Sequence, residues 1–182
     1  YNPTWFEAPI QAHQGPAAFR EVREALSIPI SDDLASIENK FDAFDYISER
    51  AIDVIQPDAA NVGGLREVQY IAQMADAASI SIAPHAAGGP VAMCATIHLD
   101  AVLPNFKIQE GFNEFTRPDW VPKVIDDPVS IEDGTIEVPQ EPGLGIDFDA
   151  DRAREHDCNP MPDHNFLSSE FKDTYGSQKH AE

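Results

Sequence analysis

The feature that most constrains this chain is a repeat of short apolar runs, each followed by a segment with helical spacing. The runs end at Glu7, Asp33, Asp58, His85 and Glu110, so successive ends lie about 25 to 27 residues apart. Parallel strands need a crossover connection of this length, and that connection is usually a helix. The sequence therefore predicts an α/β fold with parallel strands, in which every run ends on a titratable side chain.

The predicted elements alternate along the chain. We expect strands over 4–6, 27–31, 51–56, 80–83 and 106–109, and helices over 15–26, 41–49, 65–78 and 91–102. The spacing of Phe41, Phe44 and Ile47 predicts the buried face of the second helix. A complete eight-stranded (β/α) barrel takes roughly 250 residues, whereas this chain has 182. The pattern therefore predicts the C-terminal part of a (β/α) TIM-type barrel.

The chain is strongly acidic, with 32 acidic and 12 basic residues and a net charge of −20. This argues against nucleic acid and anionic membrane as partners, because both require a basic surface. The acidic residues, Asp32 among them, are dispersed and expected on surfaces, which suits a halophilic protein whose self-repulsion is screened by salt. An acidic mesophile protein is the alternative. No apolar run has the roughly 18 residues of a membrane span.

The ends of the chain and its two cysteines carry further expectations. The first residues, from Tyr1 on, lack the charged region and following apolar region of a signal peptide, so we expect none. We also suspect that the chain is truncated. Cys94 and Cys158 lack metal-type spacing, which favours a reduced, cytoplasmic setting. We expect three regions: a partial barrel over 1–117, an extension over 118–156 with a hairpin at Asp133–Gly134, and a polar, flexible tail over 157–182.

Two carboxylates at neighbouring strand ends form the first candidate site. Glu7 and Asp33 would share the mouth of a barrel, because all βα loops open on the same face. Their oxygens could hold a hard divalent cation. The alternative is that Glu7 caps the following helix and that Asp32–Asp33 is a solvated turn.

The second candidate site is the pair Asp58 and His85 on the next two strand ends. A carboxylate beside an imidazole nitrogen orients the ring and raises its basicity for proton transfer near neutral pH. Glu110 could then hydrogen-bond a substrate oxygen. The alternatives are a helix-capping Asp, an ordinary loop His and a surface Glu.

Several short motifs, taken in order, resemble one family. They are Trp-Phe-Glu-Ala-Pro at 5–9, Gln-Pro-Asp at 56–58 with Gly-Gly at 63–64, Ala-Pro-His at 83–85 with Gly-Pro at 89–90, Asn-Phe at 105–106 with Ile-Gln-Glu at 108–110, and Pro-Gly-Leu-Gly at 142–145. This set is similar to the enolase superfamily, in its mandelate racemase/muconate lactonizing branch, and especially to the galactonate- and gluconate-type dehydratases. The resemblance covers roughly residues 5–151, which would be strands 4 to 8 of the barrel.

The resemblance implies a Mg²⁺-assisted dehydration of a sugar acid, in which the proton α to a carboxylate is removed and the β-hydroxyl is eliminated. It implies that Glu7 and Asp33 are metal ligands, that Asp58 and His85 form an acid/base dyad, and that Glu110 contacts the substrate carboxylate. The longer parent enzyme is expected to be a homo-oligomer. A racemase or epimerase, or a non-catalytic module, are the rival interpretations.

Two departures from the family pattern qualify these implications. The dehydratase branch usually carries Gly-Glu where this chain has Asp32–Asp33, although the muconate-lactonizing branch uses Asp there. By this resemblance, the strands that carry the first metal ligand and the base, and the capping domain that recognises the sugar, are expected to lie outside this sequence. The 182-residue chain alone is therefore expected to be inactive.

Overall fold

The computed structural model describes residues 1–32, 37–86, 89–111, 120–126 and 129–156. The chain forms two compact units, Tyr1–Phe148 and Asp149–Glu182, and each is described by itself below. The region boundaries expected after residues 117 and 156 stay predictions.

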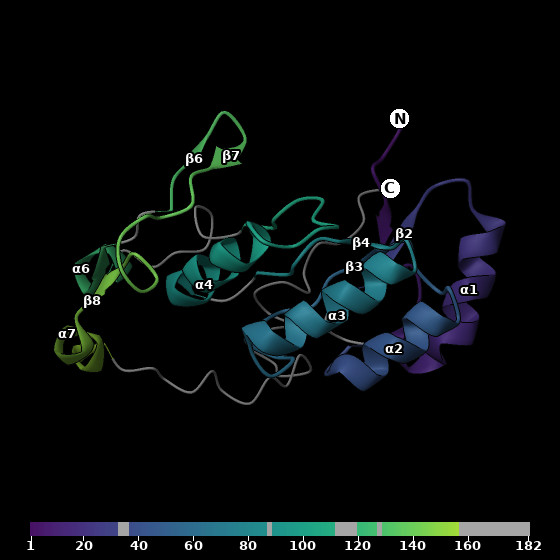
Figure 1. Cartoon of the computed structure of the whole chain (residues 1–182), viewed down its shortest axis with the longest axis horizontal. Coiled ribbons are helices and arrows are strands. Elements are labelled where there is room, and N and C mark those ends of the chain that lie inside the picture. Colours follow the sequence, from purple (N-terminus) through teal and green to yellow (C-terminus); the bar gives the residue numbers. More distant parts are fainter. Residues whose placement is uncertain (33–36, 87–88, 112–119, 127–128, 157–182) are drawn as a thin grey trace, which may run out of the picture. The chain divides into compact units, whose positions relative to one another are not determined.

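The first unit is built on a parallel four-stranded sheet in the order β1-β2-β3-β4 (Figure 1). Its strands are β1 (Phe6–Glu7), β2 (Ile30–Asp32), β3 (Val54–Ile55) and β4 (Ser81–Ile82). Glu7 pairs with Ser31, which in turn pairs with Val54. The fifth predicted strand, 106–109, is reduced to a single parallel bridge from Phe106 to Ile82. Neighbouring strands thus follow the chain order, as successive βα units require.

A helix follows each strand, which confirms the predicted alternation. These helices are α1 (Gly15–Ala25), preceded by the 3-10 turn η1 (Ala12–Gln14), then α2 (Lys40–Ser48), α3 (Leu65–Ala77) and α4 (Pro90–Asp100). Proline occupies the first turn of α1 and α4, where its missing N–H costs nothing. The side chain of Asn39 caps α2 by accepting from the N–H groups of Phe41 and Asp42.

The core lies between the sheet and helices α1 to α3, which Figure 1 shows on one side of the strands. Its largest fully buried side chains include Phe19 from α1, Ile30 and Ile55 from the strands, and Ile71 from α3. The predicted face of α2 was wrong in part: Phe41 and Phe44 are 72% and 54% exposed, whereas Ala43, Tyr46 and Ile47 are buried. Tyr46 packs edge-on against Phe19, with ring centroids 5.3 Å apart.

The end of β2 differs from the predicted solvated surface. Asp32 is 1% exposed and belongs to a strand whose three residues are all buried. The expectation that Asp32 lies on the surface was therefore wrong, because β2 continues one residue beyond the predicted strand. Asp33 lies outside the described residues.

The rest of the first unit consists of short elements after residue 120. They are α6 (Val121–Val124), β5 (Ile125–Asp126) paired with β8 (Asp147–Phe148), and the hairpin of β6 (Ile131–Glu132) and β7 (Thr135–Ile136). The predicted hairpin is confirmed: Asp133 and Gly134 connect its strands with φ of 50° and 75°, the left-handed values of a tight two-residue turn. In the second unit, α7 (Ala150–Glu155) is capped by the side chain of Asp149.

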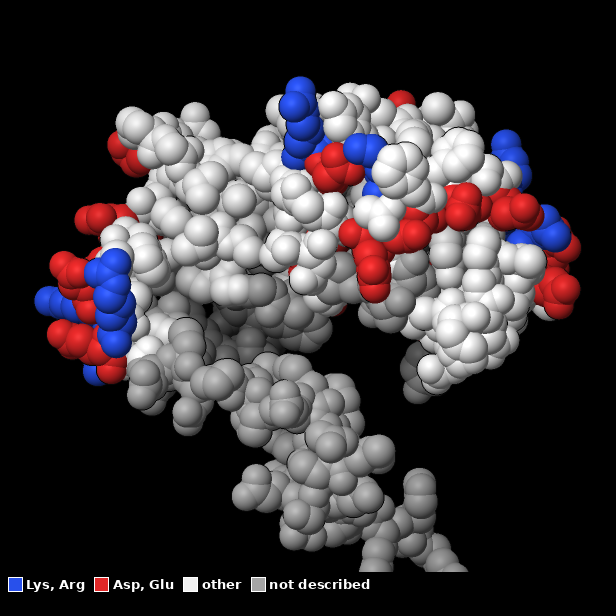
Figure 2. Space-filling view, turned by 90° about the horizontal axis from the view of Figure 1, so that it is seen from below, with Lys and Arg blue, Asp and Glu red and all other residues white. Residues whose placement is uncertain are grey.

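The surface carries its acidic residues in more than one area. On the face drawn in Figure 2, acidic side chains occur in several places, and much of the area between them is uncharged. Within the described residues, no helix has the length and apolar character needed to cross a membrane.

Candidate active site

The candidate residues lie where successive parallel strands end. Glu7 ends β1, Asp58 follows β3, His85 follows β4, and Glu110 follows the segment that bridges to β4. Because the strands are parallel and in register, their carboxyl ends share one edge of the sheet. The hydrogen bonds described next tie these strand ends together.

Asp58 is 4% exposed and accepts three hydrogen bonds. The backbone N–H of Ala60 donates to its Oδ1 at 2.7 Å, while Asn61 Nδ2 donates to its Oδ2 at 3.2 Å. His85 Nδ1 lies 3.0 Å from the same Oδ2. Since a carboxylate only accepts, the proton of this last contact lies on Nδ1. Asp58 therefore fixes both the orientation and the tautomer of the His85 ring.

The other nitrogen of His85 faces Glu110. His85 Nε2 and Glu110 Oε2 are 3.8 Å apart, too far for a direct hydrogen bond. Glu110 Oε2 instead accepts from the backbone N–H of Ala86 at 3.1 Å. The structure thus brings Asp58, His85 and Glu110 together. Among the described residues, Nε2 of His85 has no hydrogen-bond partner, so it can exchange a proton with a bound molecule.

Glu7 belongs to a separate part of the same edge. Its Oε2 accepts from Gln56 Nε2 at 2.7 Å and from Trp5 Nε1 at 3.4 Å. The residue that follows, Ala8, has a left-handed φ of 42°, and its N–H donates to Ser31 O. The predicted pairing of Glu7 with Asp33 falls partly outside the described residues.

The donors that could hold a cation are oxygens, which suits Mg²⁺. Glu7 presents a carboxylate at the strand ends, and a neutral amide rather than a competing cation holds it there. Over the ranges that the structure describes, no group of three or more His, Cys, Asp or Glu side chains is arranged to hold a metal. The described residues therefore supply part of an oxygen-ligand set and not all of it.

Two glutamines contribute to this edge that the sequence analysis left without a role. Gln56 bonds Glu7, and Gln109 Nε2 donates to Pro84 O at 3.0 Å and Glu110 O at 2.8 Å. Gln109 thereby fastens the segment bearing Glu110 to the loop bearing His85. Each glutamine directly precedes a loop that carries a candidate residue, and that position was the signal that could have identified it.

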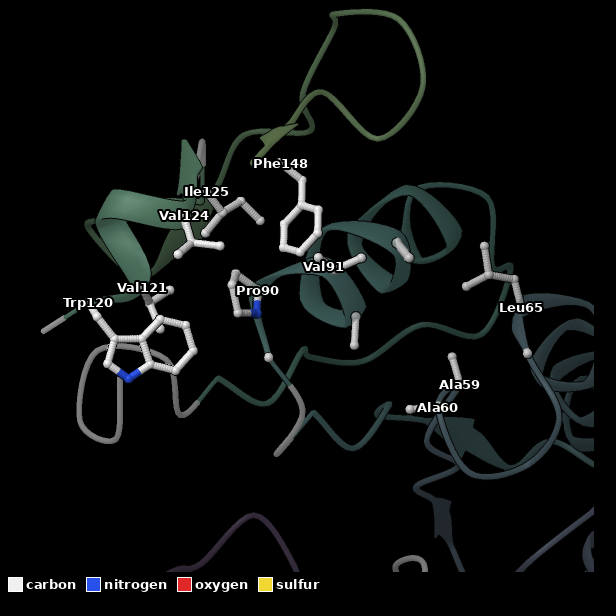
Figure 3. A pocket seen from close by; sticks show the side chains of 14 residues that line it. Ala59, Ala60, Leu65, Pro90, Val91, Trp120, Val121, Val124, Ile125 and Phe148 are labelled. Atoms are coloured by element: carbon white, nitrogen blue, oxygen red, sulfur yellow. The ribbon is translucent and has the colours of Figure 1, made fainter. Parts of the chain in front are cut away.

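An apolar pocket lies beside the candidate site (Figure 3). Its volume is about 530 Å³, and its lining includes Ala59 and Ala60, which follow Asp58 directly, together with Trp120 and Phe148. Figure 3 shows the Phe148 ring close to Pro90 and Val91 at the start of α4. The pocket presents little that could hydrogen-bond a polyhydroxylated molecule, so the polar strand ends and not this pocket carry the candidate chemistry.

Comparison with known proteins identifies the class of this chain. The sequence model of the family described as "Enolase C-terminal domain-like" matches residues 1–152. The chain belongs to this family, and its fold is a portion of a (β/α) barrel. The predicted fold class and the resemblance to the enolase superfamily are both confirmed.

Several relatives of this chain are named as sugar-acid dehydratases. The chain is 34% identical over 146 residues to D-gluconate dehydratase of Thermoproteus tenax, covering 80% of this chain and 29% of the relative. It is 32% identical over 167 residues to D-galactonate dehydratase of Xanthomonas oryzae pv. oryzae, covering 88% and 42%. The chain therefore spans less than half the length of these relatives.

A solved structure adds a ligand-bound comparison. A crystal structure of L-talarate dehydratase from Polaromonas sp. JS666, complexed with Mg and L-glucarate, matches with a TM-score of 0.68 and 27% identity. The match covers 84% of this chain and 39% of that one. That relative thus holds a magnesium ion and a sugar diacid on the same fold.

Proposed function

We propose that this chain is the C-terminal part of a Mg²⁺-dependent sugar-acid dehydratase of the cytoplasm. The reaction removes the proton α to a carboxylate and eliminates the β-hydroxyl as water, and the resulting enol tautomerises to a 2-keto-3-deoxy acid. The observation that carries the proposal is the hydrogen bond between Asp58 and His85 at the strand ends, with Glu110 Oε2 3.8 Å from the other nitrogen of His85. Relatives named as D-gluconate and D-galactonate dehydratases support the substrate class.

His85 is the proton-transfer residue in this proposal. Its Nδ1 is held by Asp58, so Nε2 is the atom that gives a proton to the departing β-hydroxyl. The Asp58 carboxylate stabilises the positive charge of the ring before that proton is given up. Glu110, with its Oε2 3.8 Å from Nε2, lies where a substrate carboxylate or hydroxyl between the two would contact both.

In this proposal the metal ligands of this chain are Glu7, which lies among the described residues, and Asp33. Bound Mg²⁺ would polarise the substrate carboxylate and so acidify the α-proton. Oxygen-only donors at the strand ends support this choice of cation. We further propose that the longer enzyme is a halophilic homo-oligomer whose other half supplies the remaining ligand and the base.

Incubating the longer enzyme with D-gluconate or D-galactonate in deuterated water tests the proposal. A dehydratase converts the sugar acid into a 2-keto-3-deoxy acid, which NMR detects by its new CHD group at C3. A racemase or epimerase would only exchange and invert the α-carbon, and that result would contradict the proposal. The 182-residue chain alone should form no product, which makes it the matched negative control.

A further inference from the structure

Gln56 connects two strands that are not neighbours. It follows β3, two residues before Asp58, and only 2% of it is exposed. Its Nε2 donates to Glu7 Oε2 at 2.7 Å, although the two residues are 49 positions apart. Strand β2 lies between β1 and β3 in the sheet. The Gln56 side chain therefore spans the end of β2 to reach Glu7.

Packing alone does not account for this residue. The Oε1 atom of Gln56 is buried and has no hydrogen-bond partner among the described residues. A buried amide oxygen without a partner costs about 1–3 kcal/mol, whereas an apolar side chain of similar length would carry no such cost. The bond from Nε2 to a carboxylate is the compensating interaction, because hydrogen bonds to charged groups are the stronger ones.

The bond also restricts Glu7, which is otherwise exposed on β1. Both donors to its carboxylate, Gln56 and Trp5, contact Oε2. Across the described residues, Oε1 of Glu7 accepts no hydrogen bond, so it is the oxygen available to another ligand. A flexible glutamate held through one oxygen presents the other in a defined direction.

We propose that Gln56 is a positioning residue, which holds the Glu7 carboxylate in one orientation for a hard divalent cation. The inference rests on the proposed function, since it takes Glu7 as a ligand of that cation. It adds a link between the two parts of the site, because Gln56 and the dyad residue Asp58 belong to the same strand end. Movement of the Asp58 loop would then also move the metal ligand.

Mn²⁺ affinity of the longer enzyme, measured from the EPR signal of the free ion, tests the proposal. Gln56→Met keeps the length of the side chain and removes the donor, so we expect Mn²⁺ to bind about tenfold more weakly, as is typical when a partner of a metal ligand is lost. Gln109→Met is the matched control, because Gln109 also has a buried Oε1 without a described partner but does not bond Glu7. The Mn²⁺ affinity of Gln109→Met should equal that of the unmodified enzyme.

The outcomes separate this inference from the proposed function. Equal Mn²⁺ affinities for the unmodified enzyme and Gln56→Met would overturn the inference alone. An unmodified longer enzyme that binds no Mn²⁺ would overturn the cation role of Glu7 and, with it, both proposals. A second measurement leaves Gln56 in place: adding Mg²⁺ should shift the side-chain amide NMR signal of Gln56 and not that of Gln109. An unmoved Gln56 signal would also overturn the inference.

Discussion

Asp58 and Asp100 are both aspartates with buried carboxyl oxygens, yet their surroundings differ completely. Asp58, at the strand ends, accepts hydrogen bonds from Ala60, Asn61 and His85. Asp100 ends α4, and neither of its buried oxygens has a hydrogen-bond partner among the described residues. Burial accordingly raises the pKa of Asp100 to about 7. Among the described residues, hydrogen-bond donors therefore stabilise a carboxylate at the strand ends but not at Asp100.

The surroundings of Asp100 explain its raised pKa. The carboxyl adjoins a cavity of about 570 Å³ lined by apolar side chains that include Phe106, Ile108 and Ile131. Lys107 is the basic side chain among the described lining residues, and it makes no ion pair with Asp100. A carboxyl in such surroundings favours its neutral form, whereas N–H donors favour the anion. Removing the charge of Asp58 should therefore lower the free energy of unfolding, whereas removing the charge of Asp100 should raise it.

The largest expected change in the free energy of unfolding is for Asp58→Ala. The substitution leaves the N–H of Ala60 and the side chains of Asn61 and His85 without their acceptor. Hydrogen bonds to a charged group are worth about 1.5–3 kcal/mol each and are not additive, so we expect a loss of about 3 kcal/mol. Urea denaturation at pH 7 measures it. A loss below about 1 kcal/mol would contradict the claim that hydrogen bonds to Asp58 stabilise the fold while Asp100, without a partner among the described residues, does not.

A smaller change in the free energy of unfolding, of opposite sign, is expected for Asp100→Asn. Between about pH 4 and pH 7 the folded chain binds more protons at Asp100 than the unfolded chain, because the pKa is raised on folding. The contribution of Asp100 to stability is therefore most favourable below about pH 4 and declines as the pH rises to about 7. Asn removes that decline and should stabilise the chain at pH 8 by about 1–2 kcal/mol.

Urea midpoints collected from pH 4 to pH 8 test this expectation. The difference between Asp100→Asn and the unmodified chain should grow across that window and then level off. A constant difference would mean that Asp100 does not titrate between these values, and the proposed contrast would fail.

The smallest change in the free energy of unfolding is expected for Glu49→Gln. This variant separates the effect of having a charged partner from the effect of burying the carboxylate. Glu49 forms an ion pair with Arg20, but the two side chains are 44% and 41% exposed. Exposed pairs contribute about 0–1 kcal/mol and are screened by salt. We expect a change below about 0.5 kcal/mol in urea denaturation at low salt, and none at high salt. A loss as large as that of Asp58→Ala would show that pairing matters more than burial.

Much of the fold could be predicted from the sequence because it depends on local pattern. Short apolar runs and helical spacing identified the four strands and four helices of the sheet region, and the Asp133–Gly134 dipeptide identified a hairpin. The face of α2 was harder, because Phe41 and Phe44 form an apolar stripe beside the true one. Which of two adjacent stripes is buried depends on the partners, here Phe19 and its neighbours.

The candidate site was predictable to the extent that topology determines it. Parallel strands bring their carboxyl ends together, so spacing alone predicted that Asp58 would be near His85, and they are in contact. The roles of Gln56 and Gln109 depend on side-chain contacts between residues far apart in the sequence, which no local pattern contains. Likewise, two consecutive aspartates suggested a solvated turn, but the sheet extends far enough to bury Asp32.

The rate of sugar-acid dehydration by the His85→Asn variant of the longer enzyme tests the central claim most directly. Asparagine can keep a hydrogen bond to Asp58 but cannot transfer a proton near neutral pH. General acid catalysis contributes about 10²–10⁴-fold, so we predict that kcat falls by at least about 100-fold with the fold retained. A variant that forms the 2-keto-3-deoxy acid at the rate of the unmodified enzyme would contradict the assignment of His85 as the proton-transfer residue.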